Sequence, residues 1–274
     1  CAMRVVQMAG PSLERCHAGV FNCAYAPIKD VRSFAEILYI LMQGTGMGFS
    51  VENQYVSRLP VVRPRRRKCV VSRMTIPDTT EGWCNAVLAK LQNRFCGHDI
   101  EFDYSGIRLA GTRLKTKGGR ASGPEPLKEL IEFIGDIMSA AQGRQLTDLE
   151  VHDIACKIGQ IVQVGGVRRA SCISLSDLNS ERMRGAKSGQ WWEKNKQRTM
   201  ANNSAVYETK PNSAEFMREW LALAESGSGE RGIFNRSGIM NRLPDRRRKA
   251  VFGVNPCAEI VLRPYGFCNL SIAV

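Results

Sequence analysis

The stretch "NPCAE", from Asn255 to Glu259, combines residue types that can do chemistry at close spacing. Pro256 stiffens the turn, which is typical of an exposed loop and predicts that the Cys257 thiol is presented rather than packed. Glu259 follows two residues after the thiol. A nearby carboxylate raises the pKa of a thiol and disfavours the thiolate. The spacing therefore argues against an ordinary cysteine nucleophile.

A histidine that could activate Cys257, as in a cysteine protease, is not recognisable. The sequence holds three histidines, none in a protease-like context: His17, His98 and His152. A neutral thiol or a thiyl radical fits the stretch better, with the Glu259 carboxylate acting as general base on a substrate hydroxyl. The amide of Asn255 could hold that hydroxyl in place.

A second cysteine lies shortly downstream, in "GFCNL". This thiol, Cys268, could pair with another cysteine across the site and deliver two electrons by becoming a disulfide. Cys23, in the predicted buried strand "FNCAY", is the natural candidate for its partner. The sequence thus suggests one thiol that starts a reaction and two that supply electrons.

Composition limits the class of protein. The chain has 274 residues and 43% hydrophobic content, enough for one large domain or two modest ones. The formal charge of +13 and the pI near 9.5 favour an anionic partner, either nucleic acid or a phosphorylated small molecule. No apolar run could span a bilayer, and the first residues lack the order of a signal peptide. We therefore expect a cytoplasmic protein.

Ten cysteines are many for a reducing compartment, where disulfide frameworks are rare. None is spaced as C-x-x-C, so we expect no metal site. Outside the three thiols discussed above, we expect the cysteines to be packing or surface thiols. These are Cys1, Cys16, Cys69, Cys84, Cys96, Cys156 and Cys172.

Hydrophobic periodicity predicts helices that alternate with short buried strands. A strand in "GVFNCAYAPI" precedes a helix over about 30–43, and the glycine-rich "GTGMGFSV" after it resembles a phosphate loop only weakly. Capping boxes predict helices that begin at Asp78 and at Thr147, and a third helix starts at Pro126. Residues 180–200 are polar and loop-like, "NNSAVYE" is a strand, and "NSAEFMREWLALAESG" is an amphipathic helix. This alternation is typical of an α/β layer or barrel.

The glycine turn "GGVRRAS" precedes an apolar strand and displays Arg168 and Arg169. Guanidinium groups suit a phosphate or the edge of a base, because they donate in a planar fork. The same pattern is compatible with an exposed polar turn. The residues alone leave both readings open.

Eight segments, in chain order, carry a family resemblance. They are "FNCAY", "GTGMGFSVE", "GGRASGP", "GGVRRAS", "NNSAVY", "GERGIFNR", "NPCAEI" and "FCNL". The ordered set closely resembles the catalytic subunit of ribonucleotide reductases, and most of all the monomeric, adenosylcobalamin-dependent class II enzymes. The resemblance implies an α/β fold with a ten-stranded barrel, of which this chain would hold the first half and the finger loop.

The resemblance also implies residue roles. Cys257 would be the thiyl radical that abstracts the ribose 3′ hydrogen, and Glu259 would deprotonate the 3′ hydroxyl. Asn255 would hydrogen-bond the ribose. Cys23 and Cys268 would be the redox pair that reduces the 2′ carbon. Substrate or effector binding is expected at Asn22, Gly165, Gly166, Arg168, Arg169 and Ser171.

The implied organisation is a partial catalytic barrel over 1–274. Within it, about 53–126 resembles the insertion that forms an effector site in monomeric members, and 250–270 would be the finger loop with its following strand. Because the sequence begins at Cys1 and stops shortly after "FCNL", we expect a piece of a longer protein that is inactive alone.

The implied cofactor is adenosylcobalamin, with deoxynucleoside triphosphates or ATP as allosteric effectors. The substrate would be a ribonucleoside triphosphate or diphosphate, and the reductant a thioredoxin-like protein. We expect a monomer that contacts neither membrane nor, directly, nucleic acid.

Three alternatives remain at this stage. A class I large subunit would use a separate metal-radical subunit. A basic nucleic-acid-binding module would explain "RPRRRK" and "PDRRRK" but not "NPCAEI". A catalytically dead relative could serve as a regulatory partner, although the five intact site residues argue against decay.

Overall fold

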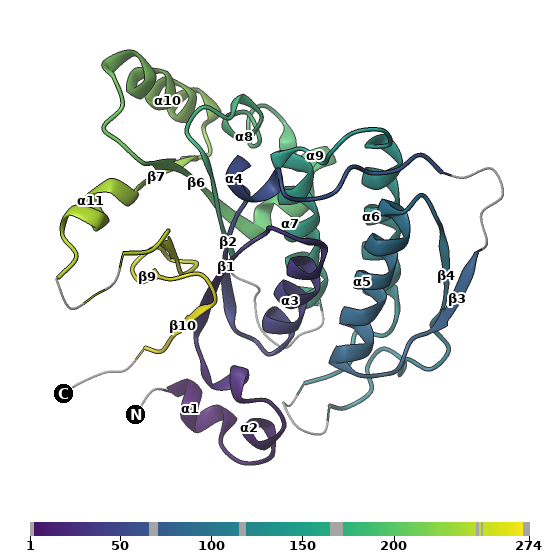
Figure 1. Ribbon diagram of the computed structural model, residues 1–274. Coiled ribbons are helices and arrows are strands. Elements are labelled where there is room, and N and C mark those ends of the chain that lie inside the picture. Colours follow the sequence, from purple (N-terminus) through teal and green to yellow (C-terminus); the bar gives the residue numbers. More distant parts are fainter. Residues whose placement is uncertain are drawn as a thin grey trace.

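The computed structural model describes residues 3–65, 71–114, 119–164, 172–244, 247 and 249–270, and every structural statement below concerns these residues. A six-stranded sheet forms its centre, in the order β10-β1-β2-β5-β6-β7 (Figure 1). The strands are β1 (Cys23–Pro27), β2 (Gly46–Ser50), β5 (Cys172–Asp177), β6 (Ala201–Tyr207), β7 (Gly232–Asn235) and β10 (Gly266–Cys268). The first five run parallel, and β10 is antiparallel to β1.

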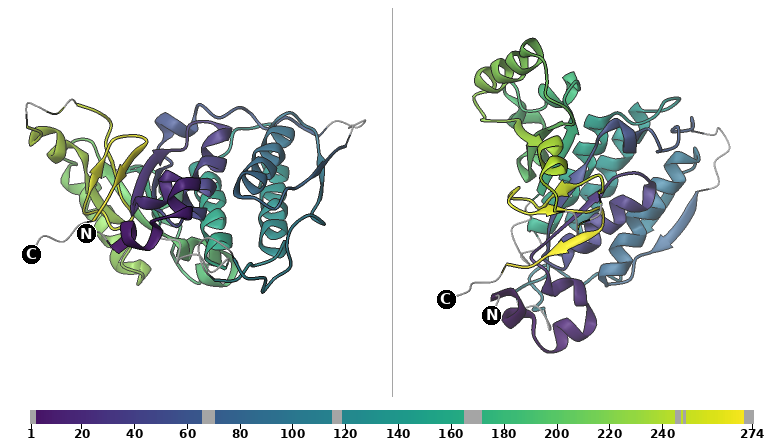
Figure 2. Two further views of the ribbon diagram at one scale, coloured as in Figure 1. Left: turned by 90° about the horizontal axis from the view of Figure 1, so that it is seen from below. Right: turned by 60° about the vertical axis from the view of Figure 1, so that its left-hand side comes forward.

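Helices cover one face of this sheet. The long helices of the fold are α3 (Val31–Met42), α5 (Thr80–Phe95), α6 (Glu125–Ala140), α7 (Asp148–Val164) and α10 (Ser213–Ser226). Shorter helices are α1 (Met3–Met8), α2 (Pro11–Arg15), α4 (Asn53–Val56), α8 (Glu181–Arg184), α9 (Trp191–Lys194) and α11 (Arg236–Asn241), with 3-10 turns at His17–Val20 and Lys196–Met200. Helices α3 and α7 lie against the sheet, and α5 and α6 form a further layer behind them (Figures 1 and 2).

Two small strand pairs complete the fold. Strands β3 (Ser72–Thr75) and β4 (Ile100–Asp103) pair in parallel on the outer side of α5. Strands β8 (Gly253–Val254) and β9 (Val261–Leu262) form an antiparallel hairpin on the sheet face opposite α3 (Figure 2). The sheet therefore has a helix side and a hairpin side.

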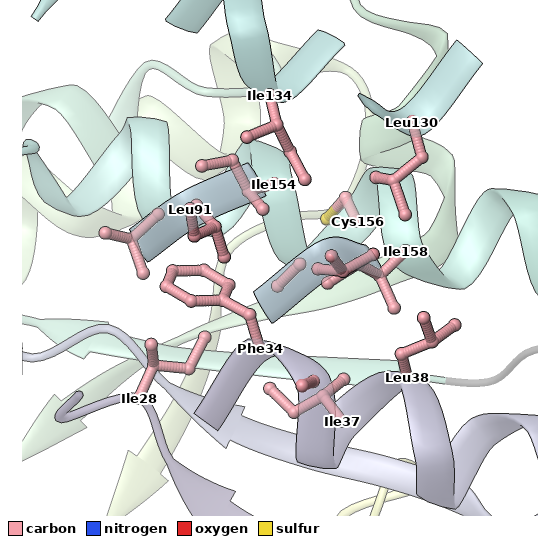
Figure 3. Close-up of a cluster of buried hydrophobic side chains, with 14 of the residues drawn as sticks. Ile28, Phe34, Ile37, Leu38, Leu91, Leu130, Ile134, Ile154, Cys156 and Ile158 are labelled. Carbon is pink, nitrogen blue, oxygen red and sulfur yellow. The ribbon is translucent and has the colours of Figure 1, made fainter. Parts of the chain in front are cut away.

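The alternation of side chains along β1 defines these two sides. Ala24 and Ala26 belong to the large apolar cluster on the helix side, whereas Cys23 and Tyr25 belong to a smaller cluster on the hairpin side. Figure 3 shows side chains of α3, α5, α6 and α7 converging in the helix-side cluster. Burial of these fully enclosed residues is the main source of stability.

The α/β fold predicted from the sequence is confirmed. Helix α3 lies within the expected range, and Asp30 caps it by accepting a hydrogen bond from Ser33 N (2.9 Å). Helix α7 is preceded by the expected capping box: Glu150 N donates to Thr147 Oγ1 (3.2 Å), and Thr147 N donates to Glu150 Oε2 (2.8 Å).

Two local expectations were wrong, and a third pattern has a different role from the one that it weakly resembles. Helix α5 is capped by Thr79, which accepts from Gly82 N, because Asp78 instead accepts a hydrogen bond from Arg108. Residues 180–200 form α8, α9 and a 3-10 turn rather than a loop. The glycines of "GTGMGFSV" lie largely in the buried central strand β2, so they do not form a phosphate loop.

Candidate active site

The β8–β9 hairpin presents Cys257 at its tip. Gly253 pairs with Leu262 and Val254 with Val261, so residues 255–260 form the connecting loop. Pro256 is buried, whereas Cys257 is exposed. The local sequence thus brings the thiol to the end of a short hairpin that lies against the sheet.

Asn255 shapes this loop through its main chain and its side chain. Its N–H donates to Ile260 O (3.1 Å), and its Oδ1 accepts from Ile260 N (2.9 Å). Ala258 N donates to Asn255 O (2.9 Å). Ala258 adopts the left-handed region at φ 65°, which is unfavourable for a residue other than glycine and so requires these restraints. Asn255 is fully buried, and its side chain can therefore fix the loop without competition from solvent.

Two glycines let the hairpin approach the sheet closely. A Cβ at Gly48 of β2 would lie 1.9 Å from Val254 O, and a Cβ at Gly253 would lie 2.1 Å from the Tyr25 ring. Neither distance is compatible with a side chain. These positions require glycine because the backbones of β2 and β8 lie against neighbouring atoms.

Cys23 and Cys268 lie directly opposite each other on adjacent strands. They are register partners in the antiparallel β1–β10 pair, and both are buried thiols. Burial, together with the nearby Cys23, raises the pKa of Cys268 to about 12. The Cys268 thiol therefore stays protonated at neutral pH, and it faces a second sulfur with which it could form a disulfide.

Asn255 links the hairpin to this cysteine pair. Its Nδ2 donates to Cys23 Sγ at 3.8 Å, a long contact to a weak sulfur acceptor. Glu259 is exposed on the same loop, and its charge contributes to the raised pKa of Cys268. The structure thus gathers the five predicted catalytic residues around one hairpin.

Asn22 joins the three strands at the amino end of β1. Its N–H donates to Cys268 O (3.0 Å), its carbonyl accepts from Gly46 N (2.9 Å), and its Oδ1 accepts from Leu270 N (3.2 Å). These contacts hold β10 against β1. The other predicted binding residues lie outside the described residues: Gly165, Gly166, Arg168, Arg169 and Ser171.

A separate cavity of about 790 Å³ lies between the amino-terminal helices and the segment after β2. Its lining includes two aromatic residues, Tyr39 and Trp83, and three arginines, Arg15, Arg108 and Arg113. Aromatic rings and guanidinium groups suit a base and phosphates, respectively. No local sequence pattern links these five residues, because they come from distant segments of the chain. The arginine-containing, glycine-rich stretch before Pro126 was the one available signal.

Among the residues that the structure describes, no cluster of side chains could hold a metal ion. Within the same residues, no helix has both the length and the apolar character needed to cross a membrane.

Comparison with known proteins bears on this site. A family model described as the insertion domain of B12-dependent ribonucleotide reductase matches residues 59–138. An adenosylcobalamin-dependent ribonucleoside-triphosphate reductase of Euglena gracilis is 31% identical over 263 residues, which cover 92% of this chain and 35% of that protein. This chain is related to the B12-dependent ribonucleotide reductases.

A second curated reductase supports the relationship, and a solved structure shows the shared fold. A protein of the same description from Lacticaseibacillus paracasei is 30% identical over 277 residues, covering 84% of this chain and 36% of its own length. A crystal structure of a B12-dependent, class II ribonucleotide reductase superposes with a TM-score of 0.70 at 22% identity, covering 95% of this chain and 42% of that one. The chain shares the reductase fold, and it spans about a third of the length of the curated reductases that it matches.

The matched insertion domain of the reductases overlaps the segment predicted from the sequence, 53–126. Trp83, Arg108 and Arg113 of the cavity lie within the match, whereas Arg15 and Tyr39 lie outside it. The cavity therefore lies where the matched segment meets the rest of the chain.

Proposed function

We propose that this chain carries the radical and redox residues of an enzyme that reduces ribonucleotides to 2′-deoxyribonucleotides. One arrangement carries the proposal: Asn255, from the hairpin that presents Cys257, contacts Cys23, and Cys23 lies opposite Cys268. A single thiol beside a paired dithiol has the composition that such a reaction requires. The names of the related reductases favour the cobalamin-dependent enzymes over the class I alternative.

The proposed first step takes place at the hairpin tip. Cys257, as a thiyl radical, removes the 3′ hydrogen of the ribose and forms an S–H bond. Glu259 accepts the proton of the 3′ hydroxyl. Asn255 would hydrogen-bond the ribose through its Nδ2, which would have to exchange its long contact with Cys23 for one with the substrate. Exposure of Cys257 and Glu259 leaves both groups accessible to a substrate.

Adenosylcobalamin, when bound, supplies the oxidising equivalent that converts the Cys257 thiol to its radical. This conversion requires an accessible thiol on a fixed support. Cys257 meets the requirement, because it is exposed and the loop that carries it is restrained by Asn255.

The proposed second step uses the cysteine pair. Cys23 and Cys268 together give two electrons and two protons as their sulfurs join in a disulfide. One proton leaves with the 2′ hydroxyl as water, and the other ends on the 2′ carbon. Glu259 returns its proton to the 3′ oxygen, and Cys257 returns its hydrogen to the 3′ carbon. The disulfide must be reduced for another turnover. A thioredoxin-like dithiol in the cytoplasm would do this.

We further propose that the 790 Å³ cavity is the effector site and that the 53–126 segment builds most of it. Tyr39 and Trp83 would flank the base, and Arg15 and Arg113 would contact the phosphates of a deoxynucleoside triphosphate or ATP, while Arg108 is paired with Asp78. The stretch 165–171 would relay effector identity to the substrate. The substrate would be a ribonucleoside triphosphate, as in the names of the relatives, and the enzyme a monomer.

The decisive experiment separates hydrogen abstraction from reduction. A longer protein that contains this chain is incubated with a ribonucleoside triphosphate, adenosylcobalamin and a dithiol. Cys257→Ser should abolish both exchange of the 3′ hydrogen and product formation, whereas Cys268→Ser should spare the first and block the second. Cys96→Ser, at an exposed thiol on another element, is the control. Deoxynucleotide formation by Cys257→Ser would refute the proposal.

The effector site has its own test. Arg113→Ala should weaken binding of a deoxynucleoside triphosphate about tenfold, because a guanidinium contact to the phosphates is lost. The change in tryptophan fluorescence on titration, to which Trp83 in the cavity should contribute, measures the affinity. Arg32→Ala removes an exposed arginine that pairs with Glu36 on α3, and it should leave the affinity unchanged. Equal affinities in the two variants would place the effector elsewhere.

A further inference from the structure

One arginine on the hairpin side of the fold is buried without a place in the proposed chemistry. Arg236 begins α11 and closes the motif "GERGIFNR", and its side chain is 2% exposed. Burying a guanidinium is costly unless every donor is satisfied. The contacts of Arg236 therefore indicate what the residue holds together.

Glu52 provides the principal contact. Arg236 donates from both terminal nitrogens to the two carboxylate oxygens of Glu52 at 2.8 Å each. Arg236 lowers the pKa of Glu52, although burial acts in the opposite direction, and Ser50 and Gln54 donate further hydrogen bonds to the same carboxylate. Glu208, which follows β6, accepts another bond from Arg236. The guanidinium thus joins the carboxyl ends of β2 and β6.

The Nε donor points to the hairpin. Arg236 Nε donates to the carbonyl of Phe252 at 2.8 Å, and Phe252 immediately precedes β8. From this anchor the chain passes through Gly253, which lies against the Tyr25 ring, and then enters the loop that carries Cys257. The Phe252 carbonyl, which we call the hairpin root, lies at the start of the hairpin and accepts a hydrogen bond from the Arg236 guanidinium. That guanidinium is itself bonded to carboxylates at the ends of β2 and β6.

We propose that Arg236 is a positioning residue for Cys257. It sets the place of the hairpin on the sheet through the Phe252 carbonyl, and through the hairpin it sets the height of the thiol above the Cys23–Cys268 pair. The importance of this placement for reduction rests on the proposed function. The placement itself can be tested without turnover.

The chain offers a closely matched control, Arg198. This side chain is also buried and pairs with both oxygens of Asp153, at 2.7 Å each, and it too donates to a main-chain carbonyl, that of Ala186. Its partners belong to α7 and the segment after β5, on the helix side. Substitution of Arg198 therefore reproduces the loss of a buried forked ion pair but not the loss of the hairpin root.

The experiment compares Arg236→Lys with Arg198→Lys in the whole chain. Lysine keeps the charge but cannot form the planar fork and the Nε bond together. Hydrogen exchange is measured at the amides of Asn255, Ala258 and Ile260, which the loop restrains. Alkylation of Cys257 is measured relative to the exposed Cys96. In Arg236→Lys, exchange at these amides should be about tenfold faster, and the ratio of the two alkylation rates should change. Arg198→Lys should leave both at wild-type values.

Two results would overturn the proposal: wild-type hairpin exchange in Arg236→Lys, or equal acceleration in the two variants. If Arg236→Lys does not fold, Glu52→Gln combined with Arg236→Gln removes both buried charges and the bond to Phe252. Glu208 loses its arginine partner in this variant, but its side chain is 57% exposed, so no buried ion is left unpaired and the same readouts apply. Because these readouts do not depend on reduction, a failed positioning role and a failed reductase assignment give different results.

Discussion

The two sides of the central sheet differ in what they bury. On the helix side, residues such as Phe34 and Ile154 form a large apolar cluster that four helices share. On the hairpin side, the cluster is small and includes Cys23 and Cys268, with the polar Asn255 beside it. The same strands contribute to both sides through alternate residues. Stability is thus concentrated on one side and potential chemistry on the other, so each can be perturbed separately.

The largest expected effect is on the helix side. Phe34→Ala should lower the free energy of unfolding by about 3–5 kcal/mol, because Phe34 is fully buried and its removal leaves a cavity. Urea denaturation measures this loss, with Val61→Ala at an exposed position as control. A loss below about 1 kcal/mol would contradict the assignment of the main core to this side.

Acid should weaken the helix side next. Burial lowers the pKa of His152 to about 3, and the nearby charges of Arg198 and Lys187 act in the same direction while Asp148 opposes them. The unfolded state binds a proton below its ordinary pKa of about 6.5, whereas the folded state stays neutral. Stability should therefore fall by about 1.4 kcal/mol per pH unit as the pH drops from about 6 towards 3.

Chemical denaturation at several pH values measures that slope. His152→Leu removes the titrating group, so the variant should lose this part of the dependence even if its stability at neutral pH differs. An unchanged slope in the variant would assign the acid sensitivity to the carboxylates instead.

A smaller effect should follow from crowding the contact between hairpin and sheet. Gly48→Ala places a Cβ against Val254 O, so the hairpin must shift at a cost of about 1–3 kcal/mol. Hydrogen exchange should increase at the hairpin amides. Gly135→Ala is the control, because a Cβ in that helix meets only Lys90 at ordinary distance. Equal exchange in the two variants would show that the hairpin does not depend on this close approach.

The smallest effect on stability is expected at the proposed radical residue. Cys257 is exposed at a loop tip, so Cys257→Ser should change the free energy of unfolding by no more than about 0.5 kcal/mol. Thermal unfolding of the two proteins measures the difference. A loss above about 2 kcal/mol would mean that the thiol supports the loop and would weaken the contrast between the two sides.

The sequence predicted the helix side well because its signals are local. The Thr147–Glu150 capping box and the apolar face of 30–43 each depend on residues within a few turns, and both appear in the structure. The short helices over 180–200 were missed for a physical reason. This segment is held by two ion pairs with distant residues, Lys187 with Glu230 and Arg198 with Asp153. A local sequence pattern cannot predict such contacts.

The site was only partly accessible from the sequence. Cys257 and Glu259 are close in the chain, so their proximity could be inferred directly. Cys23 was proposed as the partner of Cys268 from its place in a predicted buried strand, and the family resemblance implied the same pair. Their register could not be predicted, since register between strands far apart in sequence has no local signal. The cavity and the contacts of Arg236 could not be predicted from the sequence. The ion pairs of Asp78 with Arg108 and of Glu52 with Arg236 join residues that are far apart in the chain.

The contact between Asn255 and Cys23 closes a span of 232 residues. Closing so long a loop costs conformational entropy before the contact contributes any favourable energy. Such contacts therefore form late in folding. On a ribosome, β1 and α3 emerge and can pack well before β8 is synthesised. We therefore expect the reactive thiols to meet only after the scaffold that confines them already exists.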